Sequence, residues 1–150
     1  MRRSAKGVMA GWLGALAGVF LSGSAVALDS VRWEYRPLLI FTPSGTDARL
    51  SRQTTRLADA AAGLTDRRLA VYIVERSRVF TTFGAPATGV SAKGLRRRFR
   101  VPDDAFKVVL VGLDGGAKLS VDAPITTQRL FAVIDGMPMR RRELRERAAR

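Results

Sequence analysis

The fold is decided by one stretch, Arg36-Pro37-Leu38-Leu39-Ile40-Phe41-Thr42-Pro43-Ser44-Gly45-Thr46-Asp47. Its apolar run up to Phe41 is typical of a strand that is covered on both faces. The polar residues that follow predict a turn, and the sequence after Asp47 predicts a helix. Such a strand-to-helix corner commonly carries the chemistry of α/β domains, because strand ends and a helix N-terminus converge there. Here the corner contains no cysteine, no histidine and no glycine-rich phosphate loop.

The first strand has an expected parallel neighbour. Ser44-Gly45-Thr46-Asp47 fits a capping box, which predicts the start of a helix, and Gly63 is a typical C-terminal stop. The apolar run Leu69-Ala70-Val71-Tyr72-Ile73-Val74 predicts a second strand. A strand, a helix and a strand in this order form a parallel pair with a right-handed crossover. We therefore expect both strand ends, with Glu75 after the second, at one rim of the sheet.

The second half of the chain predicts the rest of a mixed sheet. Glycine, proline, serine and threonine predict a loop over residues 76–92. Leu95 and Phe99 lie one turn apart on a short helix, and we expect its arginine run on the outer side. The remaining elements are a strand over residues 106–111, a hairpin at Asp114-Gly115, an edge strand over residues 118–122 and a last helix with Leu130, Phe131 and Ile134. The order is βαβ, a helix, a β-hairpin and a helix on a mixed four-stranded sheet.

Residues 1–27 have the pattern of a secretory signal peptide. A positive segment with Arg2, Arg3 and Lys6 precedes the apolar run Val8–Leu21, and Ala25-Val26-Ala27 is a small-residue cleavage site. Cleavage near Ala27 predicts a periplasmic or secreted protein. An uncleaved membrane anchor is the alternative, although the apolar run is shorter than the roughly 20 residues that span a bilayer as a helix.

The chain is strongly basic, with 26 Lys and Arg, 13 Asp and Glu and a formal net charge of +13. Loss of the three positive charges in residues 1–27 leaves 23 − 13 = +10. Such an excess favours an anionic partner, which is an envelope polymer, a membrane surface or an envelope protein. The alternative is compositional, because arginine accumulates in proteins from GC-rich genomes. Nucleic acid is disfavoured, since no aromatic residues are interleaved with the arginines as a stacking platform.

Two arginine clusters are the candidates for anion binding, namely Arg96, Arg97 and Arg98 on the short helix and Arg140, Arg141 and Arg142 near the C-terminus. The second cluster follows a domain expected over residues 28–139. It opens a basic tail over residues 140–150, which we expect to be solvated and fraying.

The residue types exclude several kinds of catalysis. Because the chain has no cysteine and no histidine, it has no thiol redox activity, no Ser-His-Asp triad and no zinc site of the usual nitrogen and sulfur type. We expect no cofactor and no metal. A weak carboxylate-based enzyme is the remaining catalytic alternative, with Ser44, Asp47, Glu75 and Asp114 as candidates at the strand-end rim.

Two residue types near these candidates have a structural interpretation. Trp33 and Tyr35 are expected to cover an edge of the core. Met137 and Met139 are expected to pack under the final turn, because thioether metal sites usually add histidine or further methionines.

Three stretches carry a resemblance to a known family, namely Arg36-Pro37-Leu38-Leu39-Ile40-Phe41, Val109-Leu110-Val111-Gly112-Leu113-Asp114-Gly115-Gly116-Ala117-Lys118 and Leu130-Phe131-Ala132-Val133-Ile134-Asp135-Gly136-Met137-Pro138-Met139-Arg140. They resemble an exported domain of unknown function, found in bacteria and within sushi-repeat (SRPX-type) matrix proteins of animals. The resemblance covers about Trp33 to Glu143, and the family often has lysine where Leu113 stands. The element order is similar to the thioredoxin fold. This implies an α/β domain with a mixed four- to five-stranded sheet and helices on both faces.

The thioredoxin resemblance also bears on activity. Thiol oxidoreductases of that fold carry Cys-x-x-Cys just after the first strand, and peroxide reductases carry a cysteine there. In this chain Pro43 to Asp47 occupies that place without a thiol. The resemblance thus implies an exported binding or structural module, and an accessory subunit that docks on a larger envelope complex is a further alternative.

Overall fold

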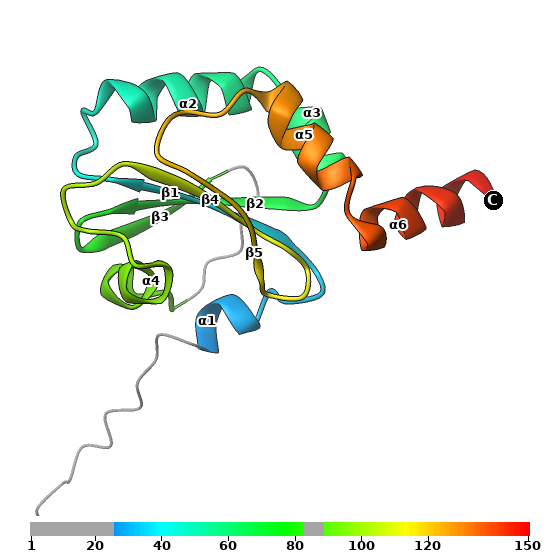
Figure 1. Cartoon of the computed structure of the whole chain (residues 1–150), viewed down its shortest axis with the longest axis horizontal. Helices are drawn as coiled ribbons and strands as arrows, with labels where there is room; N and C mark the ends of the chain where they lie inside the picture. Colours follow the sequence, from blue (N-terminus) through cyan, green and yellow to red (C-terminus); the bar gives the residue numbers. More distant parts are fainter. Residues whose placement is uncertain (1–25, 83–88) are drawn as a thin grey trace, which may run out of the picture.

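The computed structural model describes residues 26–82 and 89–150 as an α/β layer structure (Figure 1). Most of the expected signal peptide lies outside the described residues, as do residues 83–88. The described elements, in chain order, are α1 Val26–Asp29, β1 Arg36–Thr42, α2 Ala48–Ala58, α3 Ala61–Asp66, β2 Leu69–Glu75, β3 Arg78–Thr82, α4 Ala92–Phe99, β4 Lys107–Val111, β5 Ala117–Val121, α5 Thr127–Asp135 and α6 Pro138–Ala148.

The strands form one mixed sheet in the order β3-β2-β1-β4-β5. β1 and β2 are parallel, with Arg36 opposite Leu69 and Thr42 opposite Glu75, and α2 and α3 form the crossover between them. The other three pairings are antiparallel. In the turn between β4 and β5, Gly115 has φ +82°, a conformation that glycine adopts without strain. The parallel pair, the hairpin and the edge position of β5 confirm the predicted arrangement.

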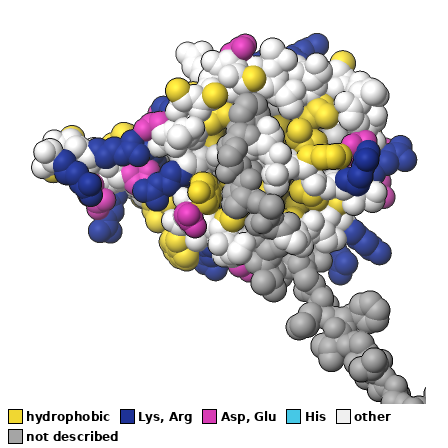
Figure 2. Space-filling model, turned by 180° about the vertical axis from the view of Figure 1, so that it is seen from behind, with side chains coloured by type: hydrophobic (Ala, Val, Ile, Leu, Met, Phe, Trp, Pro, Cys, Tyr) yellow, Lys and Arg dark blue, Asp and Glu magenta, His cyan; other side chains and the backbone are white. Residues whose placement is uncertain are grey.

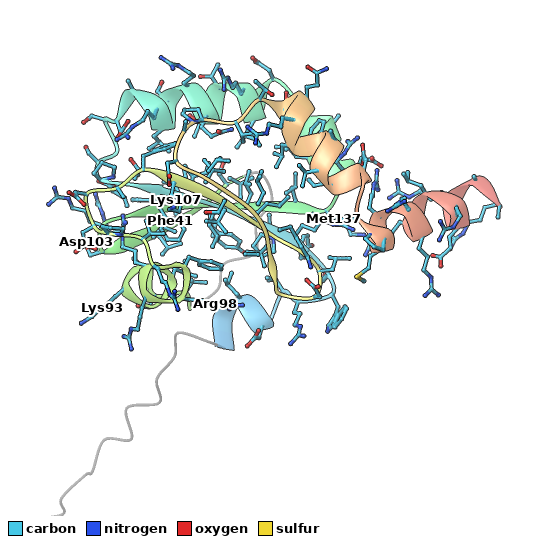
Figure 3. The ribbon with its side chains drawn as sticks, in the orientation of Figure 1. Phe41, Lys93, Arg98, Asp103, Lys107 and Met137 are labelled. Atoms are coloured by element: carbon cyan, nitrogen blue, oxygen red, sulfur yellow. The ribbon has the colours of Figure 1, made fainter. Side chains whose placement is uncertain are left out.

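β1 is buried on both faces, and its side chains alternate between two apolar cores. Leu38 and Ile40 pack with residues of α2, α3 and α5, whereas Leu39 and Phe41 pack with residues of α1 and α4. Phe41 lies between the sheet and α4, with its ring centroid 6.2 Å from that of Phe99 (Figure 3). Helices therefore cover both faces of the sheet, as the thioredoxin-like fold requires.

The helix after β1 differs from the prediction at both ends. Its N-cap is Asp47, which accepts from the Arg49 amide at 2.8 Å, whereas Ser44 Oγ accepts from the Thr46 amide at 3.1 Å and caps no helix. The predicted stop at Gly63 is also wrong, because α2 ends at Ala58 and Gly63 lies within α3. A Cβ at Gly63 would come within 2.6 Å of the Phe131 ring. Glycine is therefore needed here so that α3 can pack closely against α5.

The loop predicted over residues 76–92 is wrong for residues 78–82, which form the edge strand β3. β3 pairs antiparallel with β2. Val79 packs against a core, but Phe80 and most of the strand are exposed. Because an edge strand buries few side chains, its sequence lacks the continuous apolar run that marks the central strands.

α6 is a helix instead of the expected fraying tail from residue 140, and its first turn is anchored by Arg140. The Arg140 side chain is 1% exposed. It donates to the carboxylate of Asp66, to Asp135 at 3.3 Å and to Glu143 at 3.3 Å. Arg36, which is also buried, donates to Glu143 at 2.9 Å. Carboxylates of α3, α5 and α6 thus hold α6 against the start of β1.

We call this set of ion pairs the α6 anchor; it comprises Arg36, Asp66, Arg67, Asp135, Arg140, Glu143 and Arg147. The hydrogen bond from Arg147 is the main cause that lowers the pKa of Asp66, and the bond from Arg67 does so for Asp135. Burial alone would raise the pKa of Glu143, but hydrogen bonds and positive charge from Arg36 and Arg140 outweigh it and lower that pKa. All three carboxylates are therefore stabilised in their charged form.

Replacement of Arg140 by methionine should destabilise the protein by about 3 kcal/mol, because partly buried carboxylates lose their partner. This is the lower end of the range for buried pairs, since Asp66 and Asp135 keep 40% and 36% of their side-chain exposure. The exposed neighbour Arg141 provides the control, and Arg141→Met should change the unfolding free energy by less than about 0.5 kcal/mol. Urea unfolding at neutral pH measures both.

The same comparison at lower pH distinguishes the ion pairs from general packing. A carboxyl group with a lowered folded-state pKa stabilises the protein above its unfolded-state value, and this contribution is lost as the pH falls through the folded-state pKa. The ordinary values are 3.8 for Asp66 and 4.5 for Glu143. The difference between the natural chain and Arg140→Met should therefore be full above about pH 5 and shrink below it. A difference that stays constant into acid would contradict the anchor.

Candidate functional site

The corner after β1 is closed by its own hydrogen bonds. The Thr42 hydroxyl donates to the Ser44 carbonyl at 2.8 Å, and the hydroxyl oxygens of Ser44 and Thr46 are 2.9 Å apart. Asp47 accepts from Arg49 Nη2 at 2.6 Å, and this side-chain bonding lowers the pKa of the Asp47 carboxyl. Among the described residues no basic side chain bonds to Ser44 Oγ, so nothing activates it as a nucleophile.

Arg96 lies beneath this corner and is 4% exposed, so its predicted place on the outer side of α4 is wrong. Its Nη2 donates to the carbonyls of Thr42 at 2.9 Å and Val74 at 3.2 Å, and its Nη1 donates to the Pro102 carbonyl at 2.6 Å. Burial lowers the pKa of Arg96. Because carbonyls buried without a donor are costly, the guanidinium here satisfies the ends of β1 and β2 and ties them together.

The other members of the two arginine clusters are mostly exposed. Arg97 and Arg98 lie on the outer side of α4, and Figure 3 shows Lys93 pointing from the same helix into solvent. Arg141 and Arg142 are exposed on α6, whereas Arg140 is buried in the α6 anchor. Each cluster therefore has one buried arginine and two exposed ones, of which Arg98 donates to the Gly115 carbonyl at 3.0 Å and Arg142 pairs with Glu146.

The four polar candidates were expected at one rim of the sheet, but they lie at its two opposite ends, where the strands begin and finish. Ser44, Asp47 and Glu75 follow β1 and β2 at one edge. Asp114 follows β4, which runs antiparallel to β1, so it lies at the opposite edge. There it accepts from Lys118 at 2.7 Å, and this bond is the main cause that lowers the pKa of Asp114. The predicted grouping of the carboxylates is therefore wrong in its inclusion of Asp114.

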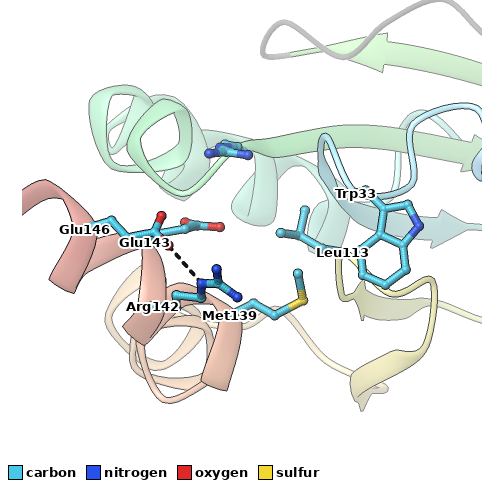
Figure 4. Close-up of a pocket in the computed structure, with 7 residues that line it drawn as sticks. Trp33, Leu113, Met139, Arg142, Glu143 and Glu146 are labelled. Carbon is cyan, nitrogen blue, oxygen red and sulfur yellow. Dashed lines mark hydrogen bonds and ion pairs between the residues drawn. The ribbon is translucent and has the colours of Figure 1, made fainter.

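At the opposite end of the sheet, where β1 and β2 begin, there is a recess beside α6 (Figure 4). Met139 reaches toward Leu113 and Trp33 across a recess of about 280 Å³. The recess is lined by Trp33, Arg68, Leu113, Met139, Arg142, Glu143 and Glu146.

Two smaller hollows extend this recess. One, of about 190 Å³, shares Arg68, Glu143 and Glu146 with it and is completed by Arg147 and Arg150. The other, of about 200 Å³, shares Leu113 and Met139 and is further lined by Arg36, Gly112, Asp114, Lys118, Met137 and Pro138. We call these three neighbouring hollows together the α6 groove. Its α6 end is lined by three arginines and two glutamates, its middle recess combines apolar and charged side chains, and the hollow beside the hairpin is the most apolar of the three.

One face of α6 forms a wall of the groove. Met139, Arg142, Glu143 and Glu146 follow one another at spacings of three, one and three residues, which places them on one face of the helix, and Arg150 lies just beyond its end. The α6 anchor fixes the start of this stripe, and the rest of α6 projects from the body of the protein (Figure 1). In Figure 2 the projecting end carries many Lys and Arg side chains and fewer acidic ones.

The opposite wall contains two residues with left-handed backbone. Trp33 has φ 69° and Arg68 has φ 51°, and each precedes a strand of the parallel pair. The Trp33 amide donates to the Leu113 carbonyl at 2.9 Å, which ties this segment to the β4–β5 hairpin. A bulky residue in this conformation is strained, and such strain is retained where the surrounding structure holds it, frequently at functional sites.

The indole of Trp33 is 57% exposed, so the expectation that it covers an edge of the core is wrong. The Arg32 guanidinium lies 5.2 Å from its ring centroid. Met137 packs against a core as expected, but Met139 is 39% exposed in the groove. Two large apolar side chains are therefore presented to solvent beside the same recess.

In the described part of the chain, the glutamates that line the groove are paired with arginines, whereas Arg68 is not paired. Glu143 is bonded to Arg36 and Arg140, and Glu146 pairs with Arg142 at 2.8 Å. Among the described residues Arg68 has no hydrogen-bond partner for its guanidinium, and its charge acts only through space to help lower the pKa of Glu143. The acidic groups are thus engaged, while a cation at the centre of the groove is available.

Sequence reasoning did not single out Trp33, Arg68 or Leu113 as a site. One signal could have found the first two, because Trp33 lies three residues before β1 and Arg68 directly before β2, and the starts of two parallel strands lie at the same end of the sheet. Leu113 comes close to Trp33 and Arg68 only because of the β4–β5 hairpin, and α6 does so only because of the α6 anchor. Both contacts connect residues that are distant in the sequence.

No group of three or more acidic residues in the described part of the chain is placed to hold a metal ion. Within residues 26–82 and 89–150, the helices are also too short or too polar to cross a bilayer.

Comparison with solved structures supports the fold assignment. A reduced 2-Cys peroxiredoxin from Plasmodium vivax superposes with a TM-score of 0.56 at 11% sequence identity, covering 77% of this chain and 84% of that chain. A cysteine-to-serine mutant of peroxiredoxin 6 from Arenicola marina superposes with a TM-score of 0.50 at 15% identity, covering 71% of this chain and 62% of that chain. At these identities the likeness shows a thioredoxin-like fold and nothing about activity.

A family model matches residues 27–143, which include every described strand and the first turns of α6. The match is described as a domain of unknown function, which agrees with that part of the family resemblance found in the sequence. The chain belongs to the DUF4174 family of domains of unknown function, with a thioredoxin-like fold.

Proposed function

We propose that this protein is an exported thioredoxin-like module that works by binding an anionic partner and not by thiol chemistry. The observation that carries the proposal is the contrast between the two edges of the sheet. The corner after β1 has no thiol and is closed by Arg96 and by its own hydrogen bonds. The α6 edge presents a groove and a projecting basic helix.

α6 is the surface best suited to an anion. Arg141 and Arg145 on α6 and Arg150 just beyond its end are exposed, and within the described residues none of these guanidinium groups has a hydrogen-bond or ion-pair partner. Exposed arginines are fully charged and offer several donors for phosphate or carboxylate oxygens. A helix that projects from the body can bring these groups to an extended polyanion without a change in the core.

Export is the second part of the proposal, and the pattern of residues 1–27 supports it. Leu28 is 4% exposed and packs in a core, so a chain that begins at this residue keeps every strand and the helices from α2 onward. The expected result of N-terminal sequencing is a periplasmic or secreted chain that begins near Leu28. A chain that keeps Met1 and stays in the cytoplasm would rule out export.

A carboxylate-based enzyme is not retained as a candidate. Asp47 and Asp114 lie at opposite edges of the sheet, and the pKa of each is lowered, whereas a general acid needs a raised value. Docking on a larger envelope protein remains compatible with the binding proposal.

The proposal is tested with polyphosphate and with anionic phospholipid vesicles as separate probes. The variant Arg141→Gln/Arg145→Gln/Arg150→Gln should bind about tenfold or more weakly, and the slope of log affinity against log salt should become shallower by about 2. A variant with equal charge loss elsewhere, Arg52→Gln/Arg100→Gln/Arg129→Gln, is the matched control and should bind nearly as the natural chain does. Binding that is insensitive to salt, or lost equally in both variants, would contradict an anion site on α6.

A further inference from the structure

We propose that the α6 groove binds an extended, acidic segment of a partner protein, with Trp33 as the apolar anchor and Arg68 as the central cation. This inference rests on the proposed function and deepens it, because it names the class of partner and the surface that receives it. The argument uses the shape, the residue types and the charge of the groove.

The shape favours a chain segment over a flat surface. The three hollows lie next to one another between α6 and the end of the sheet where β1 and β2 begin, and the middle one shares lining residues with each of the other two. A membrane surface would instead require apolar side chains on a convex face. Leu144, which is 40% exposed on α6, is not among the residues that line the groove.

The length of the groove suits a short extended peptide. The part of its wall that α6 forms starts at Met139 and continues to the end of the helix at Ala148, which is about 14 Å at 1.5 Å per residue. An extended peptide rises about 3.3 Å per residue, so roughly four residues would span that distance. A partner need only offer a loop or terminus of this length.

The residue types are those of protein interfaces. Aromatic residues, methionine and arginine are enriched at protein–protein contacts, and tryptophan and arginine are the commonest anchors. Trp33, Met139 and Leu113 supply an apolar centre, and the unbranched Met139 can adapt its shape to a partner side chain. The Arg32 guanidinium lies 5.2 Å from the Trp33 ring centroid, and the rest of the indole is open to a partner.

Charge complementarity makes the partner segment acidic. The carboxylates of Glu143 and Glu146 are already engaged by arginines, as described above. Arg68 and Arg150 line the basic end and have no hydrogen-bonded side-chain partner in the described residues. A segment that carries one apolar side chain next to Asp or Glu could place the apolar side chain against Trp33 and Met139 and pair its carboxylate with Arg68 or Arg150.

The probe is a displayed library of random short peptides, selected on the full chain and then measured singly by fluorescence anisotropy. Selected peptides should share acidic residues beside an aromatic or branched apolar residue. The variant Trp33→Asn should weaken their binding about 30-fold or more, as expected for a central anchor. Asparagine tolerates left-handed backbone, so this change removes the indole without adding strain. Arg68→Gln should weaken binding about tenfold.

Two matched controls test the place of binding. Phe80→Ala removes an exposed aromatic residue on β3, and Arg52→Gln removes an exposed charge on α2; both should leave peptide affinity within about twofold. Thermal unfolding of each variant should remain cooperative, which separates loss of the site from loss of the fold.

In addition, the Trp12→Phe chain has Trp33 as its sole tryptophan, and peptide should shift the emission of that indole. The proposal is overturned if no acidic peptides are enriched, if Trp33→Asn binds them as well as the natural chain does, or if anionic vesicles but not peptides shift Trp33 emission. Polyphosphate binding that persists in Trp33→Asn while peptides fail would remove the groove proposal and leave the anion-binding function intact.

Discussion

The structure depends on one constraint, which is that a buried arginine cannot lose its charge and must be given partners. Arg140 meets this constraint through Asp66, Asp135 and Glu143, which come from three helices, and Glu143 is shared with Arg36 at the start of β1. The contact fixes the direction in which α6 leaves the domain. The α6 groove follows from that direction, because its wall is the stripe of α6 that the anchor turns toward the sheet. A change in the anchor would therefore alter both the stability and the binding surface.

Arg96 is a second buried arginine that needs partners, and it lies at the other end of the sheet, beneath the corner after β1. Its guanidinium fills the space below the corner after β1 and bonds to carbonyls of Thr42, Val74 and Pro102. Thiol oxidoreductases of this fold place their cysteine at that corner, near the N-terminus of a helix that lowers the thiol pKa. Here the helix N-terminus is occupied by Asp47 and its partner Arg49. The fold is thioredoxin-like, while exposed Trp33 and Met139 line the groove at the opposite end of the sheet.

Local signals in the sequence were sufficient for most of the fold. The apolar runs of β1, β2 and β4 and the Asp-Gly turn predict the central strands and the hairpin, because these elements are encoded by neighbouring residues. β3 has no such run, since an edge strand is only partly buried. The sequence also could not show which arginine of each run turns inward. That choice depends on distant partners, such as the Asp66 carbonyl for Arg140 and the Thr42 carbonyl for Arg96. The groove was missed for the same reason, because its walls are joined only in three dimensions.

The central proposal is that this chain binds its partner at the α6 end of the sheet and not at the corner after β1. Photo-crosslinking in cells tests it most directly, with the same photoreactive amino acid placed at position 33 in one chain and at position 44 in another. The account predicts a discrete crosslinked partner from position 33 and none from position 44. Crosslinks from position 44 alone would contradict it, since they would place the partner at the corner that Arg96 and the hydrogen bonds of Ser44 close.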